Sequence, residues 1–110
     1  MNALRVGDPI EKVRRRFGLP IAHVPATVFE IKPGSEMRET GLNVGFPAEN
    51  ATEYLVYRHP TRTRMIRILG FRDGLFCGGT QQTFTSAAES FMARQLDQWR
   101  KQSVGPISDG

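Results

Sequence analysis

The sequence predicts an α+β domain, with helical elements packed on a three-stranded antiparallel sheet and an amphipathic helix added near the C-terminus. Three observations support this prediction. The stretch of residues 53–80 reads as three strands, Asp73-Gly74 is typical of a two-residue hairpin turn, and apolar stripes of helical period flank the stretch. The chain has 110 residues and a single cysteine. We therefore expect one domain over residues 1–103, without a disulfide framework, and a flexible tail over residues 104–110.

The first element is a short helix over Pro9–Phe17. Asp8 is a residue type that caps helix N-termini, and proline is favoured at the first helical position. Gly18 supplies a residue that tolerates positive φ at the C-terminal end. One face of this helix carries an apolar stripe formed by Ile10, Val13 and Phe17.

The region between this helix and the sheet is the least regular part of the sequence. Thr27–Lys32 alternates enough to predict a short edge strand, and Pro33-Gly34 ends it. The stretch Ser35–Asn50 holds two glycines and a proline among polar residues, which predicts a loop.

The sheet is predicted from three strands, Glu53–Arg58, Thr63–Arg72 and Leu75–Thr80. A turn containing Pro60 joins the first two. A two-residue turn at Asp73-Gly74 would pair Phe71 with Phe76 and Gly70 with Cys77.

The last element is a helix over Ala87–Gln102. Ser86 and Glu89 have the spacing of a capping box at its N-terminal end. An apolar stripe runs along it, formed by Ala88, Phe91, Met92, Leu96 and Trp99.

Both faces of the predicted sheet carry apolar side chains. A sheet with one solvated face alternates apolar and polar residues, so this sheet is expected to be covered on both faces. We expect the two helices to share one face and a partner to cover the other. The predicted partner-binding residues are Met65, Arg67, Leu69, Phe71 and Phe76.

The order of these motifs resembles the small outer-membrane lipoprotein A family, which includes the E component of the bacterial barrel-assembly machinery. The matching residues are Leu4–Val13 leading to Phe17-Gly18-Leu19-Pro20, then Tyr54-Leu55-Val56-Tyr57 and Ile66–Leu75. The resemblance implies helices on one face of a three-stranded antiparallel sheet, as in the related fold of the beta-lactamase inhibitor protein. It also implies a bacterial protein with a scaffolding or protein-binding role rather than catalysis. The C-terminal helix is an addition to the family pattern.

The residue types needed for catalysis are not clustered in this sequence. His23 and His59 lie far apart, neither has metal-ligand spacing, and Cys77 is expected to be a buried strand residue. We therefore expect no catalytic residue, no metal and no cofactor.

The function predicted is a non-enzymatic protein–protein interaction module of scaffold, assembly or inhibitor type, which binds another protein or a second copy of itself. The alternative is a small basic nucleic-acid-binding protein, since the net charge is +4 and arginines surround the hairpins. That alternative would use Arg58, Arg62, Arg64, Arg67 and Arg72. No apolar run is long enough to span a membrane. The expected location is cytoplasmic, or periplasmic or outer-membrane-associated if an export signal has been removed.

Overall fold

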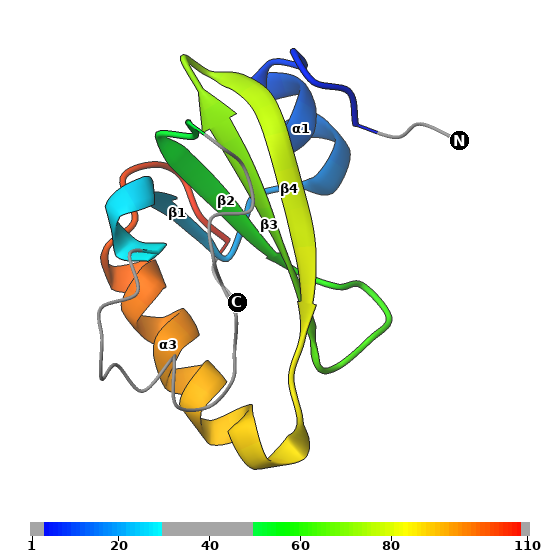
Figure 1. The fold of residues 1–110 in the computed structure, drawn as a ribbon, viewed down its shortest axis with the longest axis vertical. Coiled ribbons are helices and arrows are strands. Elements are labelled where there is room, and N and C mark those ends of the chain that lie inside the picture. The colour runs from blue at the N-terminus through cyan, green and yellow to red at the C-terminus, as the bar shows by residue number, and fades with distance from the viewer. Residues whose placement is uncertain (1–3, 30–49, 109–110) are drawn as a thin grey trace.

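The computed structural model describes residues 4–29 and 50–108, which form two α-helices and a four-stranded antiparallel sheet (Figure 1). The predicted α+β class is confirmed. The elements are, in chain order, α1 (Ile10–Phe17), β1 (Ala22–Pro25), the 3-10 turn η1 (Ala26–Phe29), β2 (Glu53–Arg58), β3 (Met65–Arg72), β4 (Leu75–Thr83), the 3-10 turn η2 (Ser86–Ala88) and α3 (Glu89–Lys101).

The sheet has one strand more than predicted, and its strand order is β1-β2-β3-β4. The prediction of a strand over Thr27–Lys32 is wrong for its first three residues, which belong to η1; the other three lie outside the described residues. The strand lies earlier, at β1, where His23 pairs with Leu55. Four residues that end in proline are too few to show a period of two, which is why the sequence did not reveal β1. The predicted loop Ser35–Asn50 lies outside the described residues, apart from its last position.

The hairpin between β3 and β4 turns at Asp73-Gly74, as predicted. Asp73 has φ 53° and Gly74 has φ 77°, the positive values that a primed two-residue turn requires. Phe71 pairs with Phe76, as predicted, but the next pair joins Gly70 to Gly78 rather than to Cys77. The half-buried Cys77 is the extra residue of a β-bulge, which no local pattern had indicated.

The helix ends differ in detail from the capping signals. The Asp8 carboxylate does not cap α1; it accepts hydrogen bonds from the backbone N–H of Arg5 at 3.0 Å and from Lys12 Nζ at 3.3 Å. No side-chain capping bond forms at η2 or at the start of α3. Glu89 instead lies 3.6 Å from Arg64. No helix within residues 4–29 and 50–108 has the length and apolar character needed to cross a membrane.

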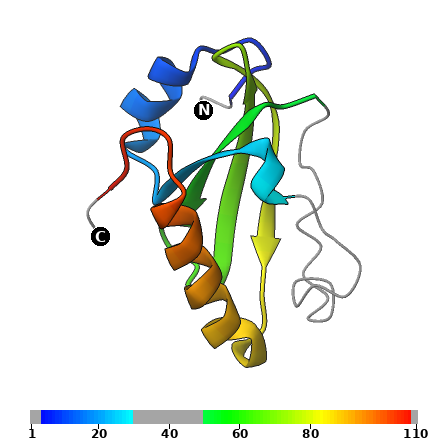
Figure 2. The same cartoon turned by 90° about the vertical axis from the view of Figure 1, so that its left-hand side faces the viewer.

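The two helices pack on opposite faces of the sheet, so the expectation that they share one face is wrong. Figure 2 shows β1 passing between α1 above it and α3 below it. Under α3 lies a core of Ile21, Ala22, Val24, Tyr54, Val56, Ile66, Ile68, Ala88, Met92, Leu96 and Trp99. Under α1 lies a second core of Val13, Leu55, Tyr57, Leu69, Phe71 and Phe76. A short helix suffices for the second face because large sheet side chains fill most of that core.

The outer edge of β1 is closed by the segment that follows α3. Val104 N–H donates to His23 O at 2.7 Å, and Ser108 N–H donates to Pro20 O at 2.8 Å. These bonds place residues 104–108, which the sequence assigned to a tail, alongside β1. Their backbone N–H groups bond to carbonyl groups at this edge that would otherwise bond to water.

Candidate functional site

The outer edge of β4 is the other edge of the sheet, and the described residues cover only its first part. Gly7 N–H donates to Phe76 O at 2.8 Å, and Phe76 N–H donates to Asp8 O at 2.7 Å. These two bonds hold the segment before α1 along the start of β4. From Cys77 to Thr83, no backbone hydrogen bond joins the outer side of β4 to another segment within the described ranges.

The register identifies which backbone groups point outward. Alternate residues of an antiparallel strand bond to opposite neighbours. Phe84 N–H donates to Arg64 O at 3.0 Å, so the even-numbered residues of this part of β4 bond to β3. The N–H and C=O groups of Gly79, Gln81 and Thr83 therefore point away from the sheet. All three residues are exposed.

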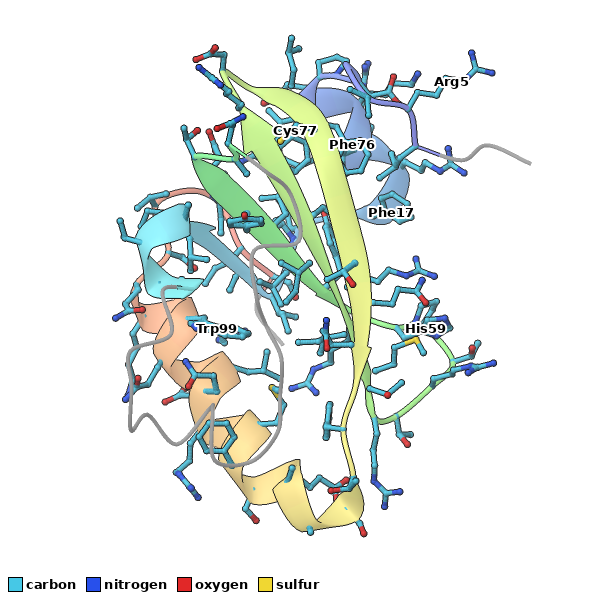
Figure 3. The ribbon with its side chains drawn as sticks, viewed as in Figure 1. Arg5, Phe17, His59, Phe76, Cys77 and Trp99 are labelled. Carbon is cyan, nitrogen blue, oxygen red and sulfur yellow. The ribbon has the colours of Figure 1, made fainter. Side chains whose placement is uncertain are left out.

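A groove of about 330 Å³ adjoins this edge on the face that α1 covers. Its lining residues are Leu4, Phe17, Arg67, Leu69, Phe76, Gly79, Thr80 and Gln81. Figure 3 shows Phe17 and Phe76 beside the part of β4 that lies against α1. Gly79 allows Leu69 to pack against β4, since a Cβ at position 79 would lie 2.8 Å from both Leu69 Cδ2 and Ile68 O.

Arg67 gives the groove a positive charge. Its guanidinium carbon lies 5.8 Å from the centre of the Phe17 ring, and Arg16 lies 5.5 Å from the same ring. Arg67 is half-buried, and its Nε is buried without a hydrogen-bond partner among the described residues. Within those residues, no acidic side chain forms an ion pair with Arg67. Burial and the charges of Arg67 and Arg62 lower the pKa of the nearby His59 below its ordinary 6.5.

The structure places most of the predicted partner-binding residues in the core rather than on a binding face. Leu69, Phe71 and Phe76 are 8%, 0% and 8% exposed, so they belong to the core under α1 and do not form an open apolar face. Edges of Leu69 and Phe76 still line the groove together with Arg67. Met65 is half-buried and lies away from the groove, in a second hollow beside the β2–β3 loop.

The five arginines of the nucleic-acid alternative do not form one surface. Arg62 and Arg64 line the second hollow, of about 430 Å³, together with Thr61, Thr63, Met65, Thr83 and Phe84. Arg72 ends β3 at the opposite end of the strand, and Arg67 lies in the groove, while Arg58 ends β2 near the loop. Bases of a bound strand often stack on aromatic side chains, but Tyr54 and Tyr57, which lie on β2 beside these arginines, are 0% and 7% exposed. They are therefore unable to stack on a bound strand.

A buried polar network lies at the closed edge of the sheet, and sequence reasoning missed it. His23 Nε2 lies 2.6 Å from Glu53 Oε1, and His23 Nδ1 lies 3.1 Å from Arg14 Nη2. An arginine can only donate, so Nδ1 is the acceptor and Nε2 carries the proton that is donated to Glu53. Sequence reasoning could not place Glu53 and Arg14 beside His23, because these partners come from distant parts of the chain.

This network has a structural role. His23 N–H donates to Ser103 Oγ at 3.0 Å, so the hydroxyl contacts the histidine backbone rather than its ring. The arrangement therefore lacks the nucleophile–base contact of a serine hydrolase. Among residues 4–29 and 50–108, no three His, Cys, Asp or Glu side chains gather as a metal-binding group. The network joins α1, β1, β2 and the segment after α3 at one point.

Comparison of the chain with protein-family models, with curated proteins and with solved structures finds no match. The resemblance to the small outer-membrane lipoprotein A family therefore stays a prediction.

Proposed function

We propose that this chain is a non-enzymatic protein-binding module whose partner adds a β-strand to the outer edge of β4. One observation carries the proposal. The backbone groups of Gly79, Gln81 and Thr83 point outward, and no described segment bonds to them, while the segment after α3 closes the opposite edge. An extended peptide that pairs with such an edge gains main-chain hydrogen bonds, and pockets beside the edge select its side chains.

The composition of β4 supports this use of the edge. Proteins usually protect an open edge with charged side chains, with proline or by covering it. The nine residues of β4, Leu75–Thr83, include no charged residue and no proline. The bulge at Cys77 lies next to the covered part, so it leaves the residues from Gly79 onward regular.

The surface proposed here differs from the one that the sequence suggested. The apolar face of the sheet is occupied by α1, and the edge beside it is the part that no described segment covers. A second copy of the chain, paired through its own β4, and a nucleic acid bound to the arginines of the β2–β3 loop are the two competing outcomes.

The test is a substitution that blocks the edge without disturbing the sheet. Gln81→Pro removes an N–H that points outward, and proline is tolerated at edge positions of this kind. Gln81→Thr is the matched control, because threonine suits a strand and keeps the N–H. Proteins captured by the wild-type chain would be purified, and their affinities for the three forms measured by calorimetry.

We expect Gln81→Pro to weaken binding of the true partner at least about tenfold, equivalent to roughly 1.4 kcal/mol. Gln81→Thr should bind like wild type. Sedimentation of the chain alone tests self-pairing, and titration with random-sequence nucleic acid at two salt concentrations tests the alternative. A folded Gln81→Pro variant that binds the partner as tightly as wild type contradicts strand addition.

A further inference from the structure

The register of β4 determines where the side chains of an added strand would lie. In neighbouring strands, paired residues place their side chains on the same face of the sheet. Residues opposite Gly79 and Gln81 would therefore point to the face of Leu69 and Arg67, their partners on β3. These two positions of the added strand are two residues apart, and both side chains reach the groove.

The position opposite Gly79 favours an apolar side chain. Gly79 has no side chain, and Leu69 Cδ2 lies 2.8 Å from where its Cβ would be, so the wall of the groove at this position is apolar. The walls there come from Leu4, Phe17, Leu69 and Phe76. An apolar side chain placed in this space is removed from water and gains about 25 cal/mol for each Å² buried.

The position opposite Gln81 favours a carboxylate. Arg67, the β3 partner of Gln81, holds a half-buried guanidinium with a buried Nε that no described residue bonds. A carboxylate accepts two parallel hydrogen bonds from a guanidinium, whereas a cationic side chain would be repelled by Arg67 and Arg16. β3 lies two strand spacings, roughly 9–10 Å, from an added strand, a gap that glutamate and arginine side chains span together.

We infer that the partner strand carries a glutamate that pairs with Arg67, and an apolar residue two positions away that fills the groove beside Phe76. This inference rests on the proposed strand addition. It also argues against a second copy as the occupant, because β4 contains no acidic residue to place opposite Arg67. The partner is thus an extended acidic segment of another protein, consistent with the net charge of +4.

The experiment uses short fluorescein-labelled peptides of alternating threonine and valine, with a leucine and a glutamate two positions apart. Blocked termini remove the terminal carboxylate, and the dye, which carries its own negative charge, is the same in every peptide. Two further peptides replace the glutamate by glutamine or by lysine. Fluorescence anisotropy measures their affinities for wild type and for Arg67→Gln, Arg67→Glu, Arg16→Gln and Gln81→Pro.

We expect the wild-type chain to bind the glutamate peptide about tenfold more tightly than the glutamine peptide, in the range of close interfacial charge pairs. Arg67→Gln should abolish this preference, and Arg67→Glu should prefer the lysine peptide. Arg16→Gln is the matched control: it removes an equal charge that also lies near the Phe17 ring but outside the groove lining, and should change the preference less than about twofold.

Three results would overturn the inference in distinguishable ways. Equal affinities for the glutamate and glutamine peptides, both lost in Gln81→Pro, leave strand addition standing and contradict the role of Arg67. A glutamate preference that survives Gln81→Pro shows a carboxylate site without strand addition, which contradicts the proposed function. Failure of the wild-type chain to bind any of the peptides contradicts both. Circular dichroism of each variant establishes that it is folded before its affinity is compared.

Discussion

Replacing Phe71 by alanine tests whether the face under α1 is core or an open binding surface. Phe71 is 0% exposed, and its ring meets that of Phe76 edge-on, with centroids 5.8 Å apart and planes at 62°. Removing a buried phenylalanine side chain costs about 3–5 kcal/mol, from lost burial and from the cavity left behind. The aromatic pair accounts for roughly 0.5–1.5 kcal/mol of that loss.

The site leaves little room for collapse, since Phe71 lies on a central strand with α1 above it. We therefore expect a loss of about 4 kcal/mol. Domains of this size have unfolding free energies of about 5–15 kcal/mol, so the loss removes a large fraction of the total. An open apolar face would instead tolerate the change with little effect on folding.

Urea unfolding followed by circular dichroism and by Trp99 fluorescence measures this loss. Trp99 is buried in the core on the opposite face, so it reports whether the whole domain unfolds with the altered face. Leu75→Ala is the control in the same hairpin, because Leu75 is 46% exposed and should lose less than about 0.5 kcal/mol. A loss below about 1 kcal/mol at Phe71, with a change in self-association, would refute the assignment of this face to the core.

Two further predictions concern the closed edge and the α1 core. Gly105→Ala places a Cβ into the His23 ring, which should lower the free energy of unfolding by roughly 1–3 kcal/mol. It should also speed hydrogen exchange at the Val104 N–H, which bonds to His23 O. Unchanged exchange at Val104 contradicts the closure of β1. Burial raises the pKa of Tyr57 to about 12, and its hydroxyl donates to Gly18 O at 2.8 Å. The pKa of Tyr57 is therefore higher in the folded chain than its ordinary value of 10. The neutral hydroxyl contributes fully to stability below pH 10, and this contribution is lost as the pH rises from 10 to about 12. The difference in phenolate absorbance between wild type and Tyr57→Phe measures the midpoint, and a value near 10 contradicts the burial.

Local chemistry in the sequence was sufficient for much of the fold. The Asp73-Gly74 turn was predicted because few dipeptides accept positive φ at both positions, and the strand Glu53–Arg58 was predicted with its correct bounds. The helix near the C-terminus was also confirmed, because its apolar stripe repeats over thirteen residues in the structure. Signals of this kind depend only on neighbours in the chain.

Long-range packing decided the features on which the proposed site depends. The bulge at Cys77 shifts the register of β4, and the sequence shows no local sign of it. The backbone bonds of Phe76 to the segment before α1 hold that helix over the second face of the sheet. The segment after α3 closes β1 by reaching His23, eighty residues from Ser103 along the chain.

The sequence by itself determined the α+β class, the β2–β3–β4 meander and the two helices, because each follows from turn chemistry or short-range periodicity. Only the tertiary structure decided which sheet face each helix covers and which edge the described residues leave uncovered. It thereby also placed Arg67 beside a groove at the β4 edge. The physical reason is that a face or an edge is closed by whichever distant segment can bury apolar area or satisfy backbone hydrogen bonds there. That choice is not encoded in the spacing of neighbouring residues.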